Sequence, residues 1–181
     1  MAKNPISEAA LHEAAVTHLA RFAATQAGLI RVLDRRIDRW ARLQEEDVAE
    51  AVKAARAAAR VVAGKLVAVG LVDDAAFAAS RARRLSQSGR SRQTIAAHLA
   101  ARGVGRATTQ AVLPEDEFAA AVAFTKRRRI GAFRRVEVEA EGRLRELGIM
   151  ARAGFAREVA LRALACAPDE AEAIVIRLRQ S

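Results

Sequence analysis

Apolar residues recur along most of the chain at intervals of three and four, the spacing that places them on one face of an α-helix. Runs of β-branched or aromatic residues, which strands favour, are scarce. The pattern therefore predicts an all-α fold of about nine to ten helices. They are expected over residues 7–24, 29–43, 45–69, 74–87, 91–103, 106–113, 115–129, 137–154 and 156–165, with a short last helix from 168, and residues 131–135 are expected to form a loop.

The helix predicted over residues 45–69 has the most regular apolar pattern. Its apolar residues follow a heptad-like spacing of four and three, so we expect the helix to pack along its whole length. This seam consists of Val48, Val52, Ala55, Ala59, Val62, Leu66 and Val69. Because most of these side chains are small, the seam favours packing within one chain over a dimeric coiled coil, and we expect a monomer.

A helix stop and a helix start follow one another between Gly70 and Phe77. Gly70 tolerates the left-handed backbone that a helix C-cap requires. Asp73 and Asp74 come next, where carboxylates can accept the unpaired N–H groups of a new helix and favour its positive dipole end. We predict that both cap the helix over residues 74–87, and that Asp74 is a possible ion-pair partner for Arg81.

Two short phrases recur along the chain. Asp74-Ala-Ala-Phe77 returns as Glu115-Asp-Glu-Phe118, and Glu8-Ala-Ala-Leu11 has the same acid-to-apolar spacing. Leu99-Ala-Ala-Arg102-Gly103 returns as Met150-Ala-Arg-Ala-Gly154, and Leu33-Asp-Arg-Arg36-Ile37 is a looser version. Such recurrence predicts three tandem three-helix repeats, stacked as an elongated, curved array of either hand. The repeats would cover residues 1–73 with the long helix, residues 74–113, and residues 114–181 with the short C-terminal helix. Chance similarity among helices rich in Ala and Arg is the alternative.

The charge of the chain indicates what kind of partner it binds. The formal net charge is +10 and the isoelectric point is about 11.3, which calls for an anionic partner. Residues 74–113 carry seven basic side chains and one acidic side chain, so the second repeat is the most basic. Nearly all the cations are arginines, whose planar guanidinium binds phosphate and carboxylate in bidentate fashion.

Two clusters of cations are the candidate binding residues. One surrounds the turn between the helices over 74–87 and 91–103, and the other follows the helix over 115–129. They consist of Arg81, Arg83, Arg84, Arg90 and Arg92, and of Lys126, Arg127, Arg128, Arg129, Arg134 and Arg135. An ordinary solvated face is the alternative. With no interleaved aromatic platform or recognition-helix pattern, nucleic acid would be contacted through phosphates rather than bases.

Residues that carry catalysis or hold metals do not combine into a recognisable site. His12 and His18 lie on different helix faces, and Cys166 has no histidine near it in sequence. Gly103-Val-Gly105 lacks the third glycine, the strand and the lysine of a phosphate-binding loop. The sequence predicts a protein without enzymatic activity, metal or cofactor. A single cysteine, no signal or transit pattern and no membrane span predict the cytoplasm.

Taken together, these phrases resemble the RecX family of regulatory proteins. The most specific part is the second repeat, with Gly70-Leu-Val-Asp-Asp74, Phe77-Ala78, Gly89, Ser91-Arg92, Ile95, Leu99 and Arg102-Gly103-Val104. The resemblance covers nearly the whole chain. The first repeat departs from the family, since Leu11 and Ala14 stand where tyrosines often occur.

The resemblance implies a cytoplasmic modulator of the RecA recombinase, acting in DNA recombination, repair and the SOS response. Members of this family bind the RecA–DNA filament, typically in its helical groove, and suppress ATP hydrolysis, strand exchange and coprotease activity. The cation clusters would then face DNA or an acidic protein surface. Two other functions stay open: a non-specific DNA-binding or nucleoid-type protein, and a helical adaptor that binds no nucleic acid.

Overall fold

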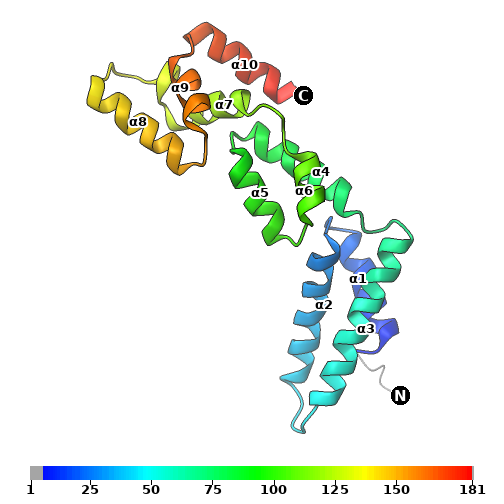
Figure 1. Cartoon of the computed structure of the whole chain (residues 1–181). Coiled ribbons are helices and arrows are strands. Elements are labelled where there is room, and N and C mark those ends of the chain that lie inside the picture. Colours follow the sequence, from blue (N-terminus) through cyan, green and yellow to red (C-terminus); the bar gives the residue numbers. More distant parts are fainter. Residues whose placement is uncertain (1–5, 181) are drawn as a thin grey trace. The chain divides into compact units, whose positions relative to one another are not determined.

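The structure, a computed structural model, describes residues 6–180. Within that range the chain forms ten α-helices and one short 3-10 helix, with no strand, as the apolar pattern predicts (Figure 1). The chain divides into two compact units. The first is Met1–Phe77 with Arg102–Gly105, and the second is Ala78–Ala101 with Arg106–Ser181.

Three helices make up most of the first unit: α1 (Glu8–Leu19), α2 (Gln26–Ala41) and α3 (Ala49–Ala68). Their apolar faces meet in one core, in which α3 packs against both α1 and α2. The largest fully buried side chains of this core are Leu11, Leu29, Leu33, Ile37, Val62 and Leu66. Burial of these aliphatic side chains is the main source of the unit's stability.

The predicted seam of α3 is confirmed in its middle and wrong at its C-terminal end. Ala55, Ala59, Val62 and Leu66 are buried, whereas Val69 is 68% exposed. The reason is that α3 ends at Ala68, and the backbone then turns through Gly70 with a φ of 74°. The amides of Leu71 and Val72 both donate to the Leu66 carbonyl, which completes the predicted C-cap.

Two local predictions about α1 and α2 are also wrong. The first helix was expected to run through residue 24, but α1 ends at Leu19, and Phe22 beyond its end is 60% exposed. Gly28 was expected to precede the second helix, but it lies in the first turn of α2. Thr25 caps this helix, because its Oγ accepts a hydrogen bond from the Gly28 amide at 2.9 Å.

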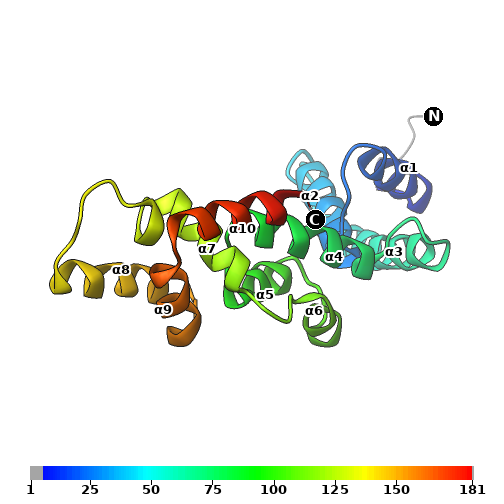
Figure 2. The ribbon, with the colours of Figure 1, turned by 90° about the horizontal axis from the view of Figure 1, so that it is seen from above.

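Seven α-helices and the 3-10 helix make up most of the second unit. They are α4 (Asp74–Gln87), whose first residues belong to the first unit, α5 (Arg92–Ala101), α6 (Arg106–Val112), α7 (Phe118–Arg128), η1 (Gly131–Phe133), α8 (Ala140–Arg152), α9 (Arg157–Ala165) and α10 (Pro168–Gln180). Helix α7 packs against α9 and α10, and Figures 1 and 2 both show α10 alongside α7. Val122 and Met150 are fully buried in this core, and the rings of Phe124 and Phe155 lie 5.4 Å apart between centroids.

The acidic pair at the start of α4 has two different roles. Asp73 caps α4, because its Oδ1 accepts hydrogen bonds from the amides of Ala75 and Ala76 at 2.9 Å. Asp74 instead accepts a hydrogen bond from the Gln26 amide of α2 at 2.8 Å. The predicted pairing of Asp74 with Arg81 is wrong, since the Arg81 Nε donates to the His98 Nε2 at 3.0 Å.

Helices α2 and α5 begin with the same set of hydrogen bonds. The Ser91 hydroxyl accepts a hydrogen bond from the Thr94 amide and donates one to the Ala153 carbonyl at 2.7 Å. Thr25 does the same in α2, donating to the Arg102 carbonyl at 2.6 Å. A carboxylate then accepts from the next amide: Asp74 from Gln26, and Glu117 from Arg92 at 2.6 Å. We call this arrangement the capping joint; the first unit and the second unit each contain one.

Glycines of the recurring phrase allow the capping joints to close. Gly103 and Gly154 follow the accepting carbonyls and have φ values of 84° and 86°. A Cβ atom on Gly103 would lie 2.4 Å from the Ala27 Cβ, and one on Gly154 would lie 2.7 Å from the Ser91 Oγ. The repeated phrase therefore marks a turn that approaches a helix N-terminus too closely for a side chain.

Candidate anion-binding site

Three of the predicted cations come together in the second unit, beside one that the sequence did not single out. Arg90 from the α4–α5 turn, Arg127 and Arg128 from the end of α7, and Arg152 from the end of α8 line a cavity of about 470 Å³. The cavity is also lined by Phe124, Ile149 and Ala153. We call it the arginine cavity.

Among the four arginines of the cavity, Arg127 is held by contacts with the surrounding protein. Its Nη1 donates a hydrogen bond to the Ser88 carbonyl at 2.8 Å. Its guanidinium carbon lies 5.3 Å from the centroid of the Phe124 ring, a distance at which a cation is attracted by the ring face. These contacts position the guanidinium before any ligand arrives.

The charges around the arginine cavity repel one another. The pKa of Arg127 is lowered, first by burial of the guanidinium and then by the nearby cations Arg90 and Arg128. None of the cavity-lining residues in the described part of the chain is acidic. An anion placed among these guanidinium groups would relieve the repulsion, and phosphate or carboxylate oxygens match their planar donors.

Three other predicted cations have partners inside the fold. Arg92 donates from its Nη1 to the carbonyls of Pro114 and Glu115. Lys126 pairs with Glu172 at 2.5 Å and lies 5.3 Å from the centroid of the Phe133 ring. Arg134 donates to the buried Glu146 from Nη2 at 2.6 Å and from Nε at 3.2 Å. Their interactions hold neighbouring elements together.

The remaining predicted cations lie apart from the arginine cavity. Arg81 is tied to His98 on the neighbouring α5, and Arg83 lines a separate cavity of about 330 Å³ with residues of α6 and α10. Arg129 ends α7 in a left-handed conformation, with a φ of 57°. The side chains of Arg83, Arg84, Arg129 and Arg135 are exposed.

Arg152 is the member of the arginine cavity that sequence reasoning missed. It lies two residues before Gly154, inside the recurring turn phrase. The capping joint brings this turn to the start of α5, beside Arg90. The recurrence of the phrase was therefore the available signal, but it gave no indication of which side chain would face the α4–α5 turn.

Groups typical of catalysis or metal binding are dispersed. Among residues 6–180 no three His, Cys, Asp or Glu side chains lie close enough together to hold a metal ion. Cys166 is buried, and burial, followed by the neighbouring Glu170, raises the pKa of its thiol. Within the same range, the helices are too short or too polar to cross a bilayer.

Comparison with known proteins agrees with the recurring phrases. A sequence model described as the second three-helix domain of RecX matches residues 73–113. The regulatory protein RecX of Myxococcus xanthus strain DK1622 is 35% identical over 161 residues, which cover 86% of this chain and 84% of the relative. The regulatory protein RecX of Agrobacterium fabrum strain C58 is 36% identical over 105 residues, covering 58% of this chain and 57% of that protein. Similarity to a regulatory protein across most of both sequences confirms the predicted family, and this chain belongs to the RecX family of regulatory proteins.

Proposed function

We propose that this chain is a non-enzymatic, cytoplasmic regulator that binds the RecA recombinase filament on DNA and inhibits ATP hydrolysis, strand exchange and coprotease activity. Membership of the RecX family is the observation that carries the proposal. The named relatives are regulatory proteins, which supports a role exerted by binding rather than by catalysis.

In this proposal the arginine cavity contacts phosphates of the filament's DNA. Four guanidinium groups without a lining carboxylate favour a polyanion, and Arg127 is already held in place by Ser88 and Phe124. Inhibition would follow from differential binding, because a ligand shifts a filament only toward the state that it binds more tightly. The favoured state would be one that neither extends nor hydrolyses ATP at the normal rate.

The first experiment measures ATP hydrolysis by RecA on single-stranded DNA with this protein added below stoichiometric amounts. We expect a lowered turnover and shorter filaments in electron micrographs. The charge reversals Arg90→Glu and Arg128→Glu, made together, should raise the concentration needed for half-inhibition at least tenfold, as expected when about 1.4 kcal/mol of binding is lost. Both side chains are exposed, so folding should be retained.

The matched control reverses two exposed arginines of the same unit that do not line the arginine cavity, Arg143 and Arg157. This control should inhibit as the unmodified protein does. Unchanged turnover and unchanged filament length with the unmodified protein would refute the proposal. Equal loss in both double variants would refute the role given to the cavity while leaving filament regulation intact.

The arginine cavity also favours a second candidate, a DNA-binding protein that needs no recombinase. That function requires tight binding to DNA alone at physiological salt, with steep loss as salt rises. Under the leading proposal, binding to DNA alone is weaker than binding to the RecA–DNA filament. Measuring both affinities in the same buffer separates the two.

A further inference from the structure

The first unit contains a groove that the arginine cavity does not explain. It lies between α1 and α2, has a volume of about 570 Å³ and is open to solvent. Ala14 of α1 and Val32 of α2, both partly exposed, supply apolar surface to its lining. This surface suits aliphatic side chains, which gain by leaving water.

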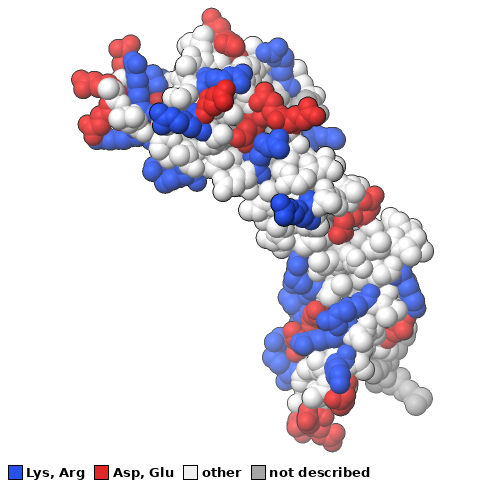
Figure 3. Space-filling view, in the orientation of Figure 1, with Lys and Arg blue, Asp and Glu red and all other residues white. Residues whose placement is uncertain are grey.

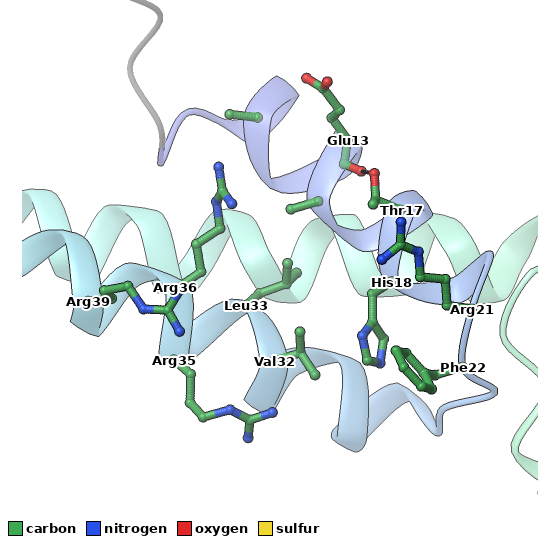
Figure 4. Close-up of a pocket in the computed structure, with 12 residues that line it drawn as sticks. Glu13, Thr17, His18, Arg21, Phe22, Val32, Leu33, Arg35, Arg36 and Arg39 are labelled. Atoms are coloured by element: carbon green, nitrogen blue, oxygen red, sulfur yellow. Dashed lines mark hydrogen bonds between the residues drawn. The ribbon is translucent and has the colours of Figure 1, made fainter.

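The charged residues of this groove are mostly of one sign. Four arginines line it, namely Arg21, Arg35, Arg36 and Arg39, against one carboxylate, Glu13. Figure 4 shows Arg21 and Arg36 at opposite ends of the groove, with Val32 and Leu33 between them. Helix α2 also carries carboxylates, but Asp38 is paired at 2.7 Å with Arg56 of α3 and does not line the groove.

An aromatic pair marks one end of the groove. The ring of Phe22 lies 5.3 Å from that of His18 between centroids, and Figure 4 shows the two rings side by side. Phe22 is 60% exposed, although it follows an apolar helix stripe. Exposed aromatic surface beside arginines is typical of the anchoring positions of protein interfaces.

We propose that the α1–α2 groove binds a short acidic peptide segment that carries apolar side chains. Carboxylates of the segment would pair with Arg35 and Arg39, which are one helical turn apart on α2, while an apolar side chain would cover Val32 and Phe22. This surface is independent of the proposed contact with DNA. It gives the protein a second recognition site, specific for acidic protein surface.

The charge around the groove favours a short acidic segment over a nucleic acid strand. Glu45, Glu46 and Asp47 follow α2, and Glu50 lies in the first turn of α3. Figure 3 shows cations gathered over α2 and acidic side chains at the tip of the α2–α3 hairpin. A long polyanion following α2 would meet these carboxylates and be repelled, whereas a segment confined to the groove would not.

The experiment titrates the full chain into a short fluorescein-labelled peptide in which glutamates alternate with leucines, and records fluorescence anisotropy. NMR spectra of the backbone amides of isotope-labelled protein then show which residues the bound peptide contacts. We expect binding, with the largest shifts at Thr17, His18 and Phe22. The double variant Arg35→Glu and Arg39→Glu should weaken binding at least tenfold, and Phe22→Ser should weaken it by a smaller factor.

The matched control reverses Arg42 and Arg60, which are exposed in the same unit and do not line the groove. It should bind the peptide as the unmodified chain does. A peptide of the same length in which lysines replace the glutamates should not bind. These results together would support the proposal.

Three results would overturn it. The acidic peptide could fail to bind, its NMR shifts could fall outside α1 and α2, or the two double variants could weaken binding equally. A single-stranded oligonucleotide provides the competing ligand. If it binds, shifts Phe22 and loses affinity in the Arg35/Arg39 variant while the peptide does not bind, the groove is a nucleic-acid surface instead.

Discussion

The hydroxyl of Ser91 accepts a hydrogen bond from the Thr94 amide and donates one to the Ala153 carbonyl. The side chain is fully buried, so neither bond can be replaced by bulk water. Thr25 is 2% exposed and has the same pair of bonds. One small hydroxyl therefore both starts a helix and fixes a turn that lies 62 or 77 residues further along the chain.

Substitution of Gly154 tests this arrangement, with Gly70 as its control. Both glycines have positive φ, so Ala at either site carries a backbone strain of about 1–2 kcal/mol. Gly70 has no atom within 4 Å of the added methyl, whereas on Gly154 the methyl would lie 2.7 Å from the Ser91 Oγ. Gly154→Ala should therefore lower the free energy of unfolding by roughly 1–3 kcal/mol more than Gly70→Ala, because a buried hydrogen bond is also disturbed. Urea unfolding followed by circular dichroism measures both. Equal losses would show that Ser91 moves aside at no cost.

At the same scale, helix caps could be predicted from the sequence, whereas long-range hydrogen-bond partners could not. The predicted capping role of Asp73 is confirmed, and Ser7 and Ser91 cap their helices in the same local way, because each cap depends on residues within three positions along the chain. The partners of Asp74 and Arg92 lie 48 and 22 residues away and could not be read from local spacing. The binding of an anion by the arginine cavity stays a proposal.

At the scale of elements, some arginines of the second unit pair with carboxylates of the same unit and therefore stabilise the fold rather than bind a ligand. Glu146 of α8 is only 6% exposed and accepts hydrogen bonds from Arg134 and from the Gly131 amide. The pair links α8 to the 3-10 helix η1 and to the residue that follows it. A buried carboxylate that loses its cation is left with an uncompensated charge, which is costly.

The change Arg134→Ala should therefore act on stability. We expect a loss of about 3 kcal/mol in the free energy of unfolding, near the lower end of what breaking a buried ion pair costs. Arg135→Ala, at the exposed neighbouring residue, should change stability by less than about 0.5 kcal/mol. Thermal unfolding of the two variants compares them directly. A larger loss for Arg135→Ala would contradict the assignment.

Helix positions were largely predictable from apolar spacing, and the errors occur at ends. Helix α4 begins and ends at the predicted residues, because Asp73 and the glycine at 89 give clear local signals. Helix α1 ends five residues before its predicted end, and α8 starts three residues after its predicted start. The apolar side chain of Phe22 continued the helical spacing in sequence, but the backbone had already left the helix.

At the scale of the whole molecule, the fold class and the family were predictable, whereas the division into three repeats and their curved array stay predictions. The recurring phrases allowed the family to be predicted because they encode turns in which a glycine lies too close to a neighbouring helix for a side chain to fit. Net charge predicted an anionic partner but could not locate its site. Where the cations gather depends on contacts such as that of Arg127 with the Ser88 carbonyl.

Salt dependence of DNA binding is a property of the whole chain and measures how many cations take part. If the arginine cavity contacts phosphates, affinity for a single-stranded oligonucleotide should fall as salt rises, with a slope of about −0.7 per phosphate neutralised. The Arg90→Glu and Arg128→Glu double variant should flatten this slope by at least about 1.4, while the Arg143 and Arg157 control should leave it unchanged. Titrations over a range of NaCl concentrations give both slopes. An unchanged slope in the cavity variant would place the phosphate contacts elsewhere.

The capping joints also determine where the chain can be divided for dissection into fragments. A fragment that ends at residue 73, where the sequence begins to repeat, would lack both Asp74 and the Arg102 carbonyl. Helix α2 would then begin with an amide and a hydroxyl stripped of their acceptors. A fragment that extends through Gly105 keeps both acceptors and contains the whole first compact unit, together with residues 78–101 of the second. A truncated fragment of this fold should therefore end after α5, the second helix of the next repeat. Each sequence repeat depends on hydrogen-bond acceptors that lie in the repeat that follows it.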